Sequence, residues 1–431
     1  MKTTWKDAGT ALTIAAALVV GGHAFATRVE TLPSTLLRRN CADPWLFRHN
    51  GKFYLTQTGA TKVFVLESAA LSGFSAADCA KTVAYDSALD PTVKKLGYKG
   101  VNGTWSPEIH RYTDVEFPGN AGWYMFLAIR DAAPSDTRHI RSVVLKSVSG
   151  EPSGPYGNPV TGEKFASQLL LGKDGNPCAD WAVGQSSLVV RTGEWKGVYA
   201  LFVTEKGRGT RDFHQEIRIA RLKTPWLFAS DSCVVTVPTQ FWETVGASRT
   251  VRRDPAKKGT GAAAYFPRVV EGATAVYGDR GDVYIAYSGS GYWTNYGLGQ
   301  LAWTGEDPLK ASSWTKFAFN PVFTVADQRG KHLPGVDLQG AGHASFFRDA
   351  DGKRFLVYHA YPYNASKEGK KVGGETLAPG AKGKHRNAYV EPYRIDYGEW
   401  NGTGWGVLHI GAKDDARPAP PETAVSYALE D

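Results

Sequence analysis

The chain has 431 residues and a formal net charge of +8, and 42% of its residues are hydrophobic, 21% charged and 12% aromatic. Its basic residues are scattered and form no stripe interleaved with aromatic residues, which argues against a nucleic-acid-binding protein. The 13 Trp and 20 Tyr are typical of a β-protein whose binding site offers rings for stacking.

The N-terminus has the three parts of an export signal. Lys2 and Lys6 precede an apolar run over residues 11–22, which is followed by Ala24-Phe25-Ala26. This pattern predicts a signal peptide over residues 1–26, cleaved after its last alanine. The run is shorter than the ~20 apolar residues of a spanning helix, although an uncleaved anchor is the competing interpretation. We therefore expect a secreted protein, extracellular or periplasmic, with no membrane contact after cleavage.

One short phrase, a turn glycine followed by a β-rich run, occurs five times after this segment. Its aromatic residues stand 70, 75, 85 and 71 residues apart. They are Tyr54, Tyr124, Tyr199, Tyr284 and Phe355. A strand-like segment lies on either side of each phrase, which predicts about four antiparallel strands per repeat. Such a recurring unit is typical of a radially repeated fold. The sequence therefore predicts an all-β, five-bladed β-propeller over residues 27–431, with a tail from about residue 412.

Some segments and side chains interrupt the repeats. Residues 246–264 show no strand pattern, and residues 367–384, with five Lys and five Gly, are predicted to be a mobile surface loop.

The four cysteines of an exported chain predict up to two disulfides, with three possible connectivities. Pairing Cys41 with Cys79 and Cys178 with Cys233 would staple one repeat each. Their spacing fits no zinc site.

A polar residue precedes each aromatic residue of the phrase by 11 to 16 positions. The five are Asp43, Glu108, Gln185, Glu271 and His343. In a propeller the innermost strands line the central channel, so these residues are expected to meet at one mouth of it. Three of them are acids. Glycoside hydrolysis needs one carboxylic acid to protonate the leaving oxygen and one carboxylate to activate water or to attack. The pattern therefore predicts a glycoside hydrolase.

At these positions the sequence resembles the family 43 glycoside hydrolases, five-bladed propellers that act mostly on arabinose- and xylose-containing glycans. The resemblance runs from about residue 40 to residue 397 and depends on the order and spacing of short motifs. They are Cys41-Ala42-Asp43-Pro44-Trp45-Leu46, Thr104-Trp105-Ser106-Pro107-Glu108-Ile109-His110, Val270-Glu271-Gly272-Ala273 and Gly340-Ala341-Gly342-His343-Ala344-Ser345-Phe346. The segment from Tyr287 to Tyr296 also resembles the one that follows the acid-bearing strand in that family.

The resemblance implies that Asp43 is the general base and Glu271 the general acid of an inverting enzyme. The two carboxyl groups of such an enzyme stand about 6.5–9.5 Å apart to hold a water molecule. Glu271 must then stay protonated near neutral pH, which burial and nearby negative charge can arrange. His343 matches the family's axial histidine, which in some members helps to hold calcium or a water cluster; we expect no required cofactor. Three tryptophans are predicted to offer sugar-stacking surface, with a place in the core as the alternative: Trp45, Trp105 and Trp293.

One position departs from the family pattern. The family has a third carboxylate there, which orients the acid and raises its pKa, whereas this chain has Gln185. An amide forms hydrogen bonds but carries no charge. Asp180, five residues earlier, and Glu108 are the candidate substitutes. The departure motivates an alternative function, a non-catalytic carbohydrate-binding propeller.

A second alternative is a related five-bladed fold that acts on fructosides through a carboxylate nucleophile and with retention. We expect a monomer whose partner is a plant-type polysaccharide or oligosaccharide. The sugar, the linkage and the choice between exo and endo cleavage depend on loops around the channel mouth.

Overall fold

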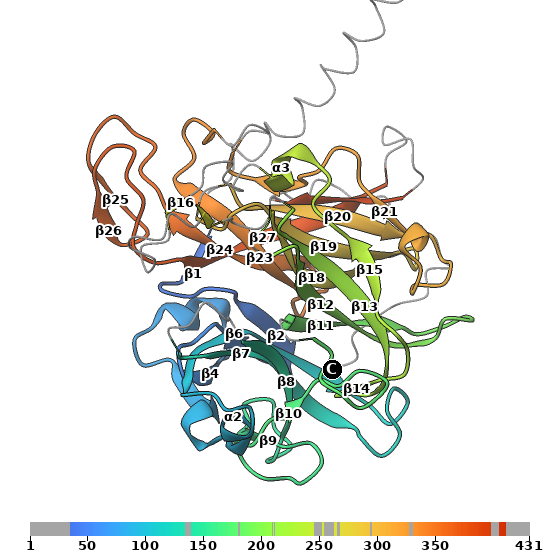
Figure 1. Cartoon of the computed structure of the whole chain (residues 1–431). Helices are drawn as coiled ribbons and strands as arrows, with labels where there is room; N and C mark the ends of the chain where they lie inside the picture. Colours follow the sequence, from blue (N-terminus) through green and yellow to red (C-terminus); the bar gives the residue numbers. More distant parts are fainter. Residues whose placement is uncertain are drawn as a thin grey trace, which may run out of the picture.

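Short antiparallel sheets surround one central axis and make a five-bladed β-propeller, which confirms the predicted fold (Figure 1). The computed structural model describes residues 35–410, with gaps at 134–138, 180–181, 209, 211, 245–251, 254–262, 265–267, 294, 327–330 and 398–404. The predicted signal peptide and the tail lie outside these residues.

Each blade has its innermost strand at the channel and its later strands further out. Blade one contains β2 (Trp45–His49), β3 (Lys52–Thr56), β4 (Lys62–Ser68) and β5 (Ala80–Asp86). Blade two contains β6 (Val101–Tyr112), β7 (Gly122–Asp131), β8 (Ile140–Ser147), β9 (Tyr156–Gly157) and β10 (Gln168–Leu169). Blade three contains β11 (Ala182–Val190), β12 (Gly197–Lys206), β13 (His214–Thr224), β14 (Leu227–Phe228) and β15 (Cys233–Thr236).

The second half of the ring follows the same plan. Blade four contains β18 (Val270–Tyr277), β19 (Val283–Gly289), β20 (Gly297–Trp303), β21 (Trp314–Lys316) and β22 (Phe323–Thr324). Blade five contains β23 (Leu338–Arg348), β24 (Arg354–Pro362), β27 (Asn387–Asp396), β28 (Val407–Ile410) and, from the start of the chain, β1 (Thr35–Arg38). Two separate hairpins pair β16 (Arg252–Arg253) with β17 (Ala263–Ala264), and β25 (Lys370–Val372) with β26 (Glu375–Leu377). The helical segments are short: η2 (Leu71–Ser75), η3 (Ser87–Leu89), α2 (Pro91–Lys95), α3 (Phe241–Thr244) and η4 (Ala311–Ser313).

The five recurring phrases form the second strands of the blades, as predicted. The turn between β2 and β3 shows why a glycine begins the phrase. His49 pairs with Lys52, so Asn50 and Gly51 form a two-residue loop, and both have positive φ angles, 46° and 76°. This is the turn whose twist matches that of the flanking strands, and glycine adopts its second position without steric cost.

The hydrophobic core is divided among the junctions between neighbouring blades. Buried residues form five clusters, and each one joins two adjacent blades. Tyr199 of blade three packs with Ile285 of blade four in one cluster, and Leu46 of blade one packs with Val357 of blade five in another. Because blade five also packs against blade one, the ring is closed.

The ring is also closed by backbone pairing. The N-terminal strand β1 lies antiparallel to β27, with Thr35 opposite Val390 and Leu36 opposite Tyr389. Blade five is therefore made from both ends of the described chain, as the blue strand among the red ones shows (Figure 1).

The predicted disulfides are not formed, because all four cysteines are free thiols in the structure. Cys178 packs against the cluster between blades two and three and Cys233 against the cluster between blades three and four, so these two face different junctions. Cys41 is fully buried between blades five and one, and burial raises the pKa of its thiol to about 12. Cys79 packs against the same cluster, with its Sγ 3.7 Å from the carbonyl oxygen of Glu67.

The lysine- and glycine-rich segment is more ordered than the sequence predicted, because it contains the hairpin of β25 and β26. Lys370 forms an ion pair with Asp337 at 2.5 Å, and the buried amide of Asn364 donates to the carbonyl oxygens of Glu368 and Leu377.

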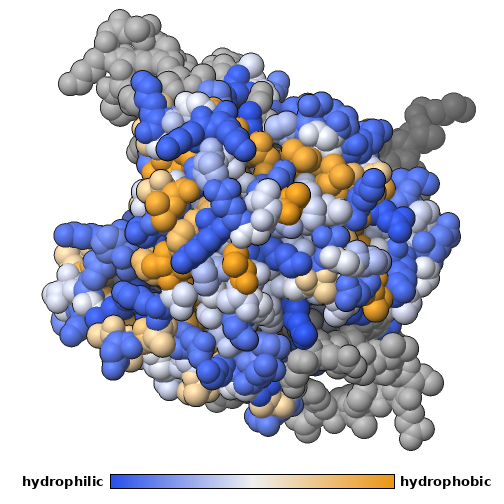
Figure 2. Space-filling model, turned by 90° about the horizontal axis from the view of Figure 1, so that it is seen from below, coloured by the Kyte–Doolittle hydropathy of each residue, from blue (hydrophilic) through white to orange (hydrophobic). Residues whose placement is uncertain are grey.

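None of the helices in the described ranges is long and apolar enough to cross a bilayer. On the face shown in Figure 2, hydrophobic residues form separate groups among hydrophilic ones.

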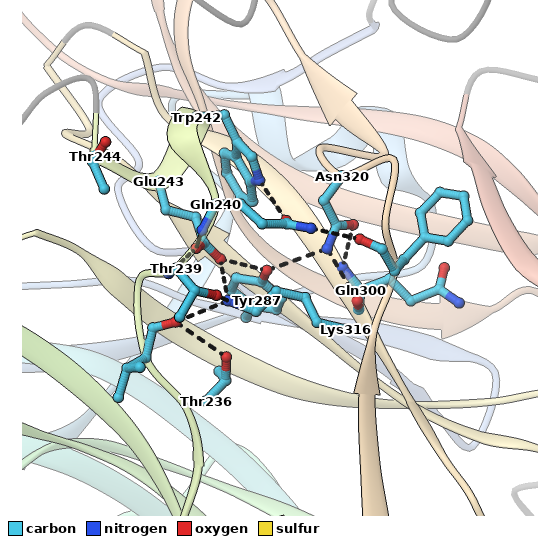
Figure 3. A network of polar contacts seen from close by, with 12 residues as sticks. Thr236, Thr239, Gln240, Trp242, Glu243, Thr244, Tyr287, Gln300, Lys316 and Asn320 are labelled. Carbon is cyan, nitrogen blue, oxygen red and sulfur yellow. Dashed lines mark hydrogen bonds and ion pairs between the residues drawn. The ribbon is translucent and has the colours of Figure 1, made fainter. Parts of the chain in front are cut away.

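A buried ion pair fixes the segment after β15 to blade four (Figure 3). Glu243 of α3 has a fully buried side chain, and its Oε1 accepts from Lys316 Nζ and from Tyr287 Oη, each at 2.7 Å. Its Oε2 accepts from the backbone N–H groups of Thr239 and Gln240, also at 2.7 Å each. A buried carboxylate is tolerated only when it is paired and hydrogen-bonded in this way.

Removing this carboxylate charge should destabilise the fold. Glu243→Gln leaves the ammonium group of Lys316 buried without a counter-charge, so we expect a loss of about 3 kcal/mol in the free energy of unfolding. Urea unfolding of the two proteins measures this. The double variant with Lys316→Met should recover part of the lost free energy of unfolding, because it removes the unpaired ammonium charge. Unchanged stability in the single variant, or no recovery in the double variant, would contradict the expected role of the pair.

Candidate active site

Four innermost strands share one irregularity near the channel. The pairing register shifts between Trp105 and Glu108, between Val183 and Ser186, between Glu271 and Thr274, and between Gly342 and Ser345. In each case two residues of the innermost strand oppose a single residue of its neighbour, which is a β-bulge, and a bulge turns side chains away from the regular alternation.

Asp43 has the same unusual backbone conformation as the first residue of several of these bulges. We call such a position on or beside an innermost strand, with a positive φ, a corner. The first bulge residue has a positive φ in three of the blades, namely 48° at Ser106, 58° at Gly272 and 53° at His343, and Asp43, two residues before β2, has a φ of 51°. A positive φ is uncommon for residues other than glycine and often marks a functional position.

The five predicted polar residues lie on or beside innermost strands, but they are not equivalent as the sequence spacing suggested. Asp43 and His343 occupy the corner with positive φ. Glu271 comes immediately before its corner, Gln185 is the second bulge residue, and Glu108 follows the bulge. The offset matters because neighbouring residues of a strand point to opposite faces. The positions of the five residues in their strands therefore do not repeat from blade to blade.

Asp43 is held by three basic groups and one hydroxyl group. Its Oδ1 lies 2.9 Å from Arg386 Nη1, 3.1 Å from His359 Nδ1 and 3.5 Å from His343 Nδ1. Its Oδ2 accepts a hydrogen bond of 2.5 Å from Thr58 Oγ1. The same hydroxyl oxygen accepts from the backbone N–H of Ser106 at 2.9 Å, and so ties Asp43 to the corner of blade two.

These groups keep Asp43 ionised. Burial alone would raise the pKa of its carboxyl group, but Arg386, His343 and the hydrogen bond with His359 together hold that pKa well below its usual range. For His359, burial and Arg386 lower the pKa to about 3, so the imidazole is neutral. The backbone N–H of Asp43 donates to Nδ1 of this ring at 3.0 Å, and Arg386 Nη1 lies 3.3 Å from its Nε2.

Both oxygens of Glu271 are engaged as well. Oε1 accepts a hydrogen bond of 2.7 Å from Tyr296 Oη, and Oε2 accepts one of 3.1 Å from Gln215 Nε2. Burial, followed by the charges of Glu271 and Asp43, raises the pKa of Tyr296 well above its usual value, so this phenol stays neutral. The partners of Glu271 are thus neutral groups, whereas those of Asp43 are basic.

Two routes link the carboxyl groups of Asp43 and Glu271. The ring of Tyr296 stacks on that of His359 at 5.6 Å, and His359 contacts Asp43. Gly272 follows Glu271, and a Cβ atom added to it would lie 3.0 Å from Nδ1 of His343, which faces Asp43. The structure therefore brings one carboxyl group of blade one and one of blade four to the same end of the channel.

Glu108 lies apart from these two groups in its contacts. It is buried, and its Oε2 is 3.0 Å from Nε2 of His110. Trp45 packs its ring at 4.7 Å on that of His110 and donates from Nε1 to the carbonyl oxygen of Ile109, so it belongs largely to the junction of blades one and two.

The other predicted residues have different surroundings. Trp105 lies under the guanidinium group of Arg130, at 5.5 Å. The carbonyl oxygen of Trp293 accepts from Lys382 Nζ at 3.4 Å, and its ring makes an edge contact with Tyr292. Asp180 lies outside the described residues, and of Gln185 the structure describes only the backbone in β11.

Several residues of the site were not predicted, because they lie outside the repeated motifs. Arg386 comes just before β27, His359 is in the second strand of blade five, and Gln215 is the second residue of β13, the third strand of blade three. Thr58 follows β3 in blade one. Tyr296 ends the family-like segment after β19, and this was the one available signal.

The axial metal that the family resemblance suggests does not fit this donor set. Across the described ranges, no three His, Cys, Asp or Glu side chains gather in a way that would hold a metal ion. His343 instead faces Asp43, whose Oδ1 also takes the charge of Arg386.

A five-bladed propeller with carboxyl groups from two blades at one channel mouth has the architecture and the chemistry of a glycoside hydrolase. The family model described as glycosyl hydrolases family 43 matches residues 33–400, and the chain belongs to this family.

Among named relatives, the chain is 28% identical over 414 residues to an extracellular exo-α-(1→5)-L-arabinofuranosidase of Streptomyces avermitilis, covering 94% of this chain and 69% of that protein. It is 25% identical over 349 residues to α-L-arabinofuranosidase B of Pyricularia oryzae, covering 80% of this chain but only 58% of the fungal protein.

Solved structures confirm the fold. The crystal structure of an α-L-arabinofuranosidase from Lactobacillus brevis superposes with a TM-score of 0.55 at 20% identity, over 83% of this chain and 91% of that one. An endo-1,4-β-xylanase from Bacteroides thetaiotaomicron gives 0.53 at 17% identity, over 88% and 97%.

Proposed function

We propose that this chain is a secreted hydrolase that releases arabinose from arabinose-containing plant-type glycans, with xylosides as the second substrate class, and that it inverts the anomeric centre. The substrate class is supported by the two arabinofuranosidases among its relatives, and export is supported by residues 1–26 and by the extracellular relative. The observation that carries the proposal is the pair of carboxyl groups, in which Asp43 pairs with the guanidinium group of Arg386 and Glu271 is held by neutral groups.

The two environments suit the two roles. Asp43, kept ionised, takes a proton from a water molecule as the water oxygen bonds to the anomeric carbon. Glu271 donates its proton to the glycosidic oxygen as the bond from that oxygen to the anomeric carbon breaks on the opposite face. Asp43 ends protonated and Glu271 ionised, and exchange with solvent restores both. Thr58 orients the base through Oδ2, and His359 Nδ1 accepts from the backbone N–H of Asp43.

Arg386 has an additional part in this arrangement. Its guanidinium group contacts Asp43 Oδ1 and also lies 4.7 Å from the centre of the Tyr292 ring, which is 39% exposed. Tyr292 therefore offers an aromatic face beside the base, and we include it with Trp293 as a surface on which a sugar ring stacks.

Replacing this arginine should change the pH dependence in a defined direction. Arg386 favours the ionised form of Asp43, so Arg386→Met should raise the pKa of the base and move the acidic limb of kcat/KM to higher pH by about one unit or more. His343 and His359 also face Asp43 and are unchanged by the substitution. The control is Arg394→Met, which removes an exposed cation from β27 and should leave the limb in place. An unmoved limb in Arg386→Met would contradict the assignment of Asp43.

The decisive experiment incubates the mature protein with aryl arabinofuranosides, aryl xylosides, arabinan and arabinoxylan and follows the first-formed anomer by NMR. Release of arabinose with inverted configuration supports the proposal. Retention would favour the nucleophilic mechanism of the fructoside-cleaving relatives. Saturable glycan binding without product from a folded sample would favour the non-catalytic propeller.

A further inference from the structure

A glutamine on the third strand of blade three contacts the candidate acid. Gln215 is 5% exposed and lies near the start of β13, and its Nε2 is 3.1 Å from Glu271 Oε2. The other atom of the same amide, Oε1, is buried and has no hydrogen-bond partner among the residues that the structure describes. An unsatisfied buried carbonyl oxygen is costly and requires an explanation.

The backbone fixes this amide relative to Glu271. The N–H of Gln215 donates to the carbonyl oxygen of Arg268 at 2.9 Å, and the N–H of Arg268 donates to the carbonyl oxygen of Phe213 at 3.0 Å. These bonds join the start of β13 to the residues just before β18. Both backbone segments are therefore anchored, and rotation about the last side-chain bond of Gln215 is the smallest movement that changes which amide atom faces Glu271.

That rotation exchanges a donor for an acceptor. With Nε2 toward Glu271 the amide donates and matches the ionised carboxylate; with Oε1 in the same place it accepts and matches the protonated acid. A general acid passes through both forms in every catalytic cycle. Oε1 is the atom without a partner in one orientation, and the half-turn brings it to Glu271.

We propose that Gln215 is a positioning residue that holds Glu271 in both of its protonation states by turning its amide. The inference rests on the proposed function, because it takes Glu271 to be the general acid. A charged side chain at this place would accept but not donate, so it would suit only the protonated form. In this way a neutral amide of blade three orients the acid.

Titratable groups of the described chain lie near this contact on several elements, and Arg268 just before β18 is one of them. Tyr296 faces Oε1 of Glu271, and Asp43 lies beyond Tyr296. On β13 the two neighbours of Gln215, His214 and Glu216, are 3.7 Å apart. As neighbours of Gln215 on the strand, they lie on its opposite face.

The test compares Gln215→Met, which keeps the length of the side chain but removes its hydrogen bond, with Gln300→Met. Gln300 is also buried on the third strand of a blade, and its amide bonds to the backbone of Gly406 and Leu408 away from Glu271. Each variant is assayed on an arabinofuranoside with a poor leaving group and on its 2,4-dinitrophenyl counterpart, which leaves without protonation, and the melting temperature is recorded.

Gln215→Met should lower kcat at least about tenfold on the poor leaving group, change KM less than about twofold, and barely affect the dinitrophenyl substrate. Gln300→Met should affect both substrates equally. Gln215→Glu brings a negative charge against Glu271, so the basic limb of its pH profile should move upward by about one unit. Equal losses on both substrates in Gln215→Met, or an unmoved basic limb in Gln215→Glu, would overturn the proposal.

The variant Glu271→Gln distinguishes a wrong acid assignment from a wrong role for Gln215. If the loss of kcat in Glu271→Gln depends on the leaving group but the loss in Gln215→Met does not, only the role of Gln215 is overturned. If the loss in Glu271→Gln is independent of the leaving group, the acid assignment is wrong and the role of Gln215 is overturned with it.

Discussion

Replacing Glu271 by glutamine should lower kcat on arabinan or an alkyl arabinofuranoside at least about a thousandfold while the protein stays folded. The amide cannot donate a carboxylic proton to the leaving oxygen, and general acid catalysis contributes about 10²–10⁴ in rate. Glutamine has nearly the same shape, so the contacts with Tyr296 and Gln215 can still form. Steady-state kinetics on substrates of graded leaving-group ability measure the effect.

Glu108→Gln is the matched control for this experiment. Glu108 is also a buried acid of an innermost strand, but its carboxylate contacts His110. We expect kcat to change less than about tenfold, with the main effect on KM if this residue binds substrate. A loss in Glu108→Gln as large as that in Glu271→Gln, with the same dependence on the leaving group, would transfer the acid role to blade two.

Replacing Asp43 by asparagine should be at least as damaging, with a loss of about 10⁴ or more in kcat for all leaving groups. Without the carboxylate no group at this corner accepts the proton of the attacking water, whatever group departs. The loss should therefore be insensitive to the leaving group, in contrast to that of the acid variant. Turnover near the wild-type value in a folded Asp43→Asn protein would refute the base assignment.

The same variant has a stability signature. The pKa of Asp43 is lower in the folded protein than its ordinary value of 3.8, so its ionisation stabilises the fold above that pH. That contribution is lost as the pH falls below 3.8 and through the lower folded-state pKa. Wild type should therefore be more stable than Asp43→Asn at pH 7, and the difference should narrow below about pH 4. Thermal unfolding across this range tests it, and a constant difference would contradict it.

The fold was predictable because the repeated phrase, a turn glycine followed by a β-rich run, marks the second strand of every blade. Tyr54, Tyr124, Tyr199 and Tyr284 are buried in second strands, where a turn glycine and a β-rich run leave little choice of structure. The position of polar residues on innermost strands was predictable for the same reason. The exact position of each polar residue relative to the β-bulge was not predictable, because a bulge inserts a residue without changing the composition of the strand, as at Glu271 and Gly272.

The partners of the two carboxyl groups were largely invisible in the sequence. Arg386 reaches Asp43 across a separation of 343 residues, and Gln215 reaches Glu271 from a third strand in another blade. Such contacts depend on how blades pack around the axis, and no local pattern marks them. The disulfide prediction was wrong for a related reason, since spacing along the chain does not tell which blade junction a cysteine such as Cys178 faces.

The pairing of β1 with β27 has a consequence for the order in which the protein matures. Thr35 leaves the ribosome or an export channel long before its partner Val390. Until then the last blade lacks its outer strand, and blade one has no neighbour on one side. Long-range pairing of this kind is slow, and unpaired strand edges invite association with other chains. Newly made molecules should therefore be most vulnerable to aggregation and proteolysis just before the ring closes, and a chain cut short before β27 should never leave that state.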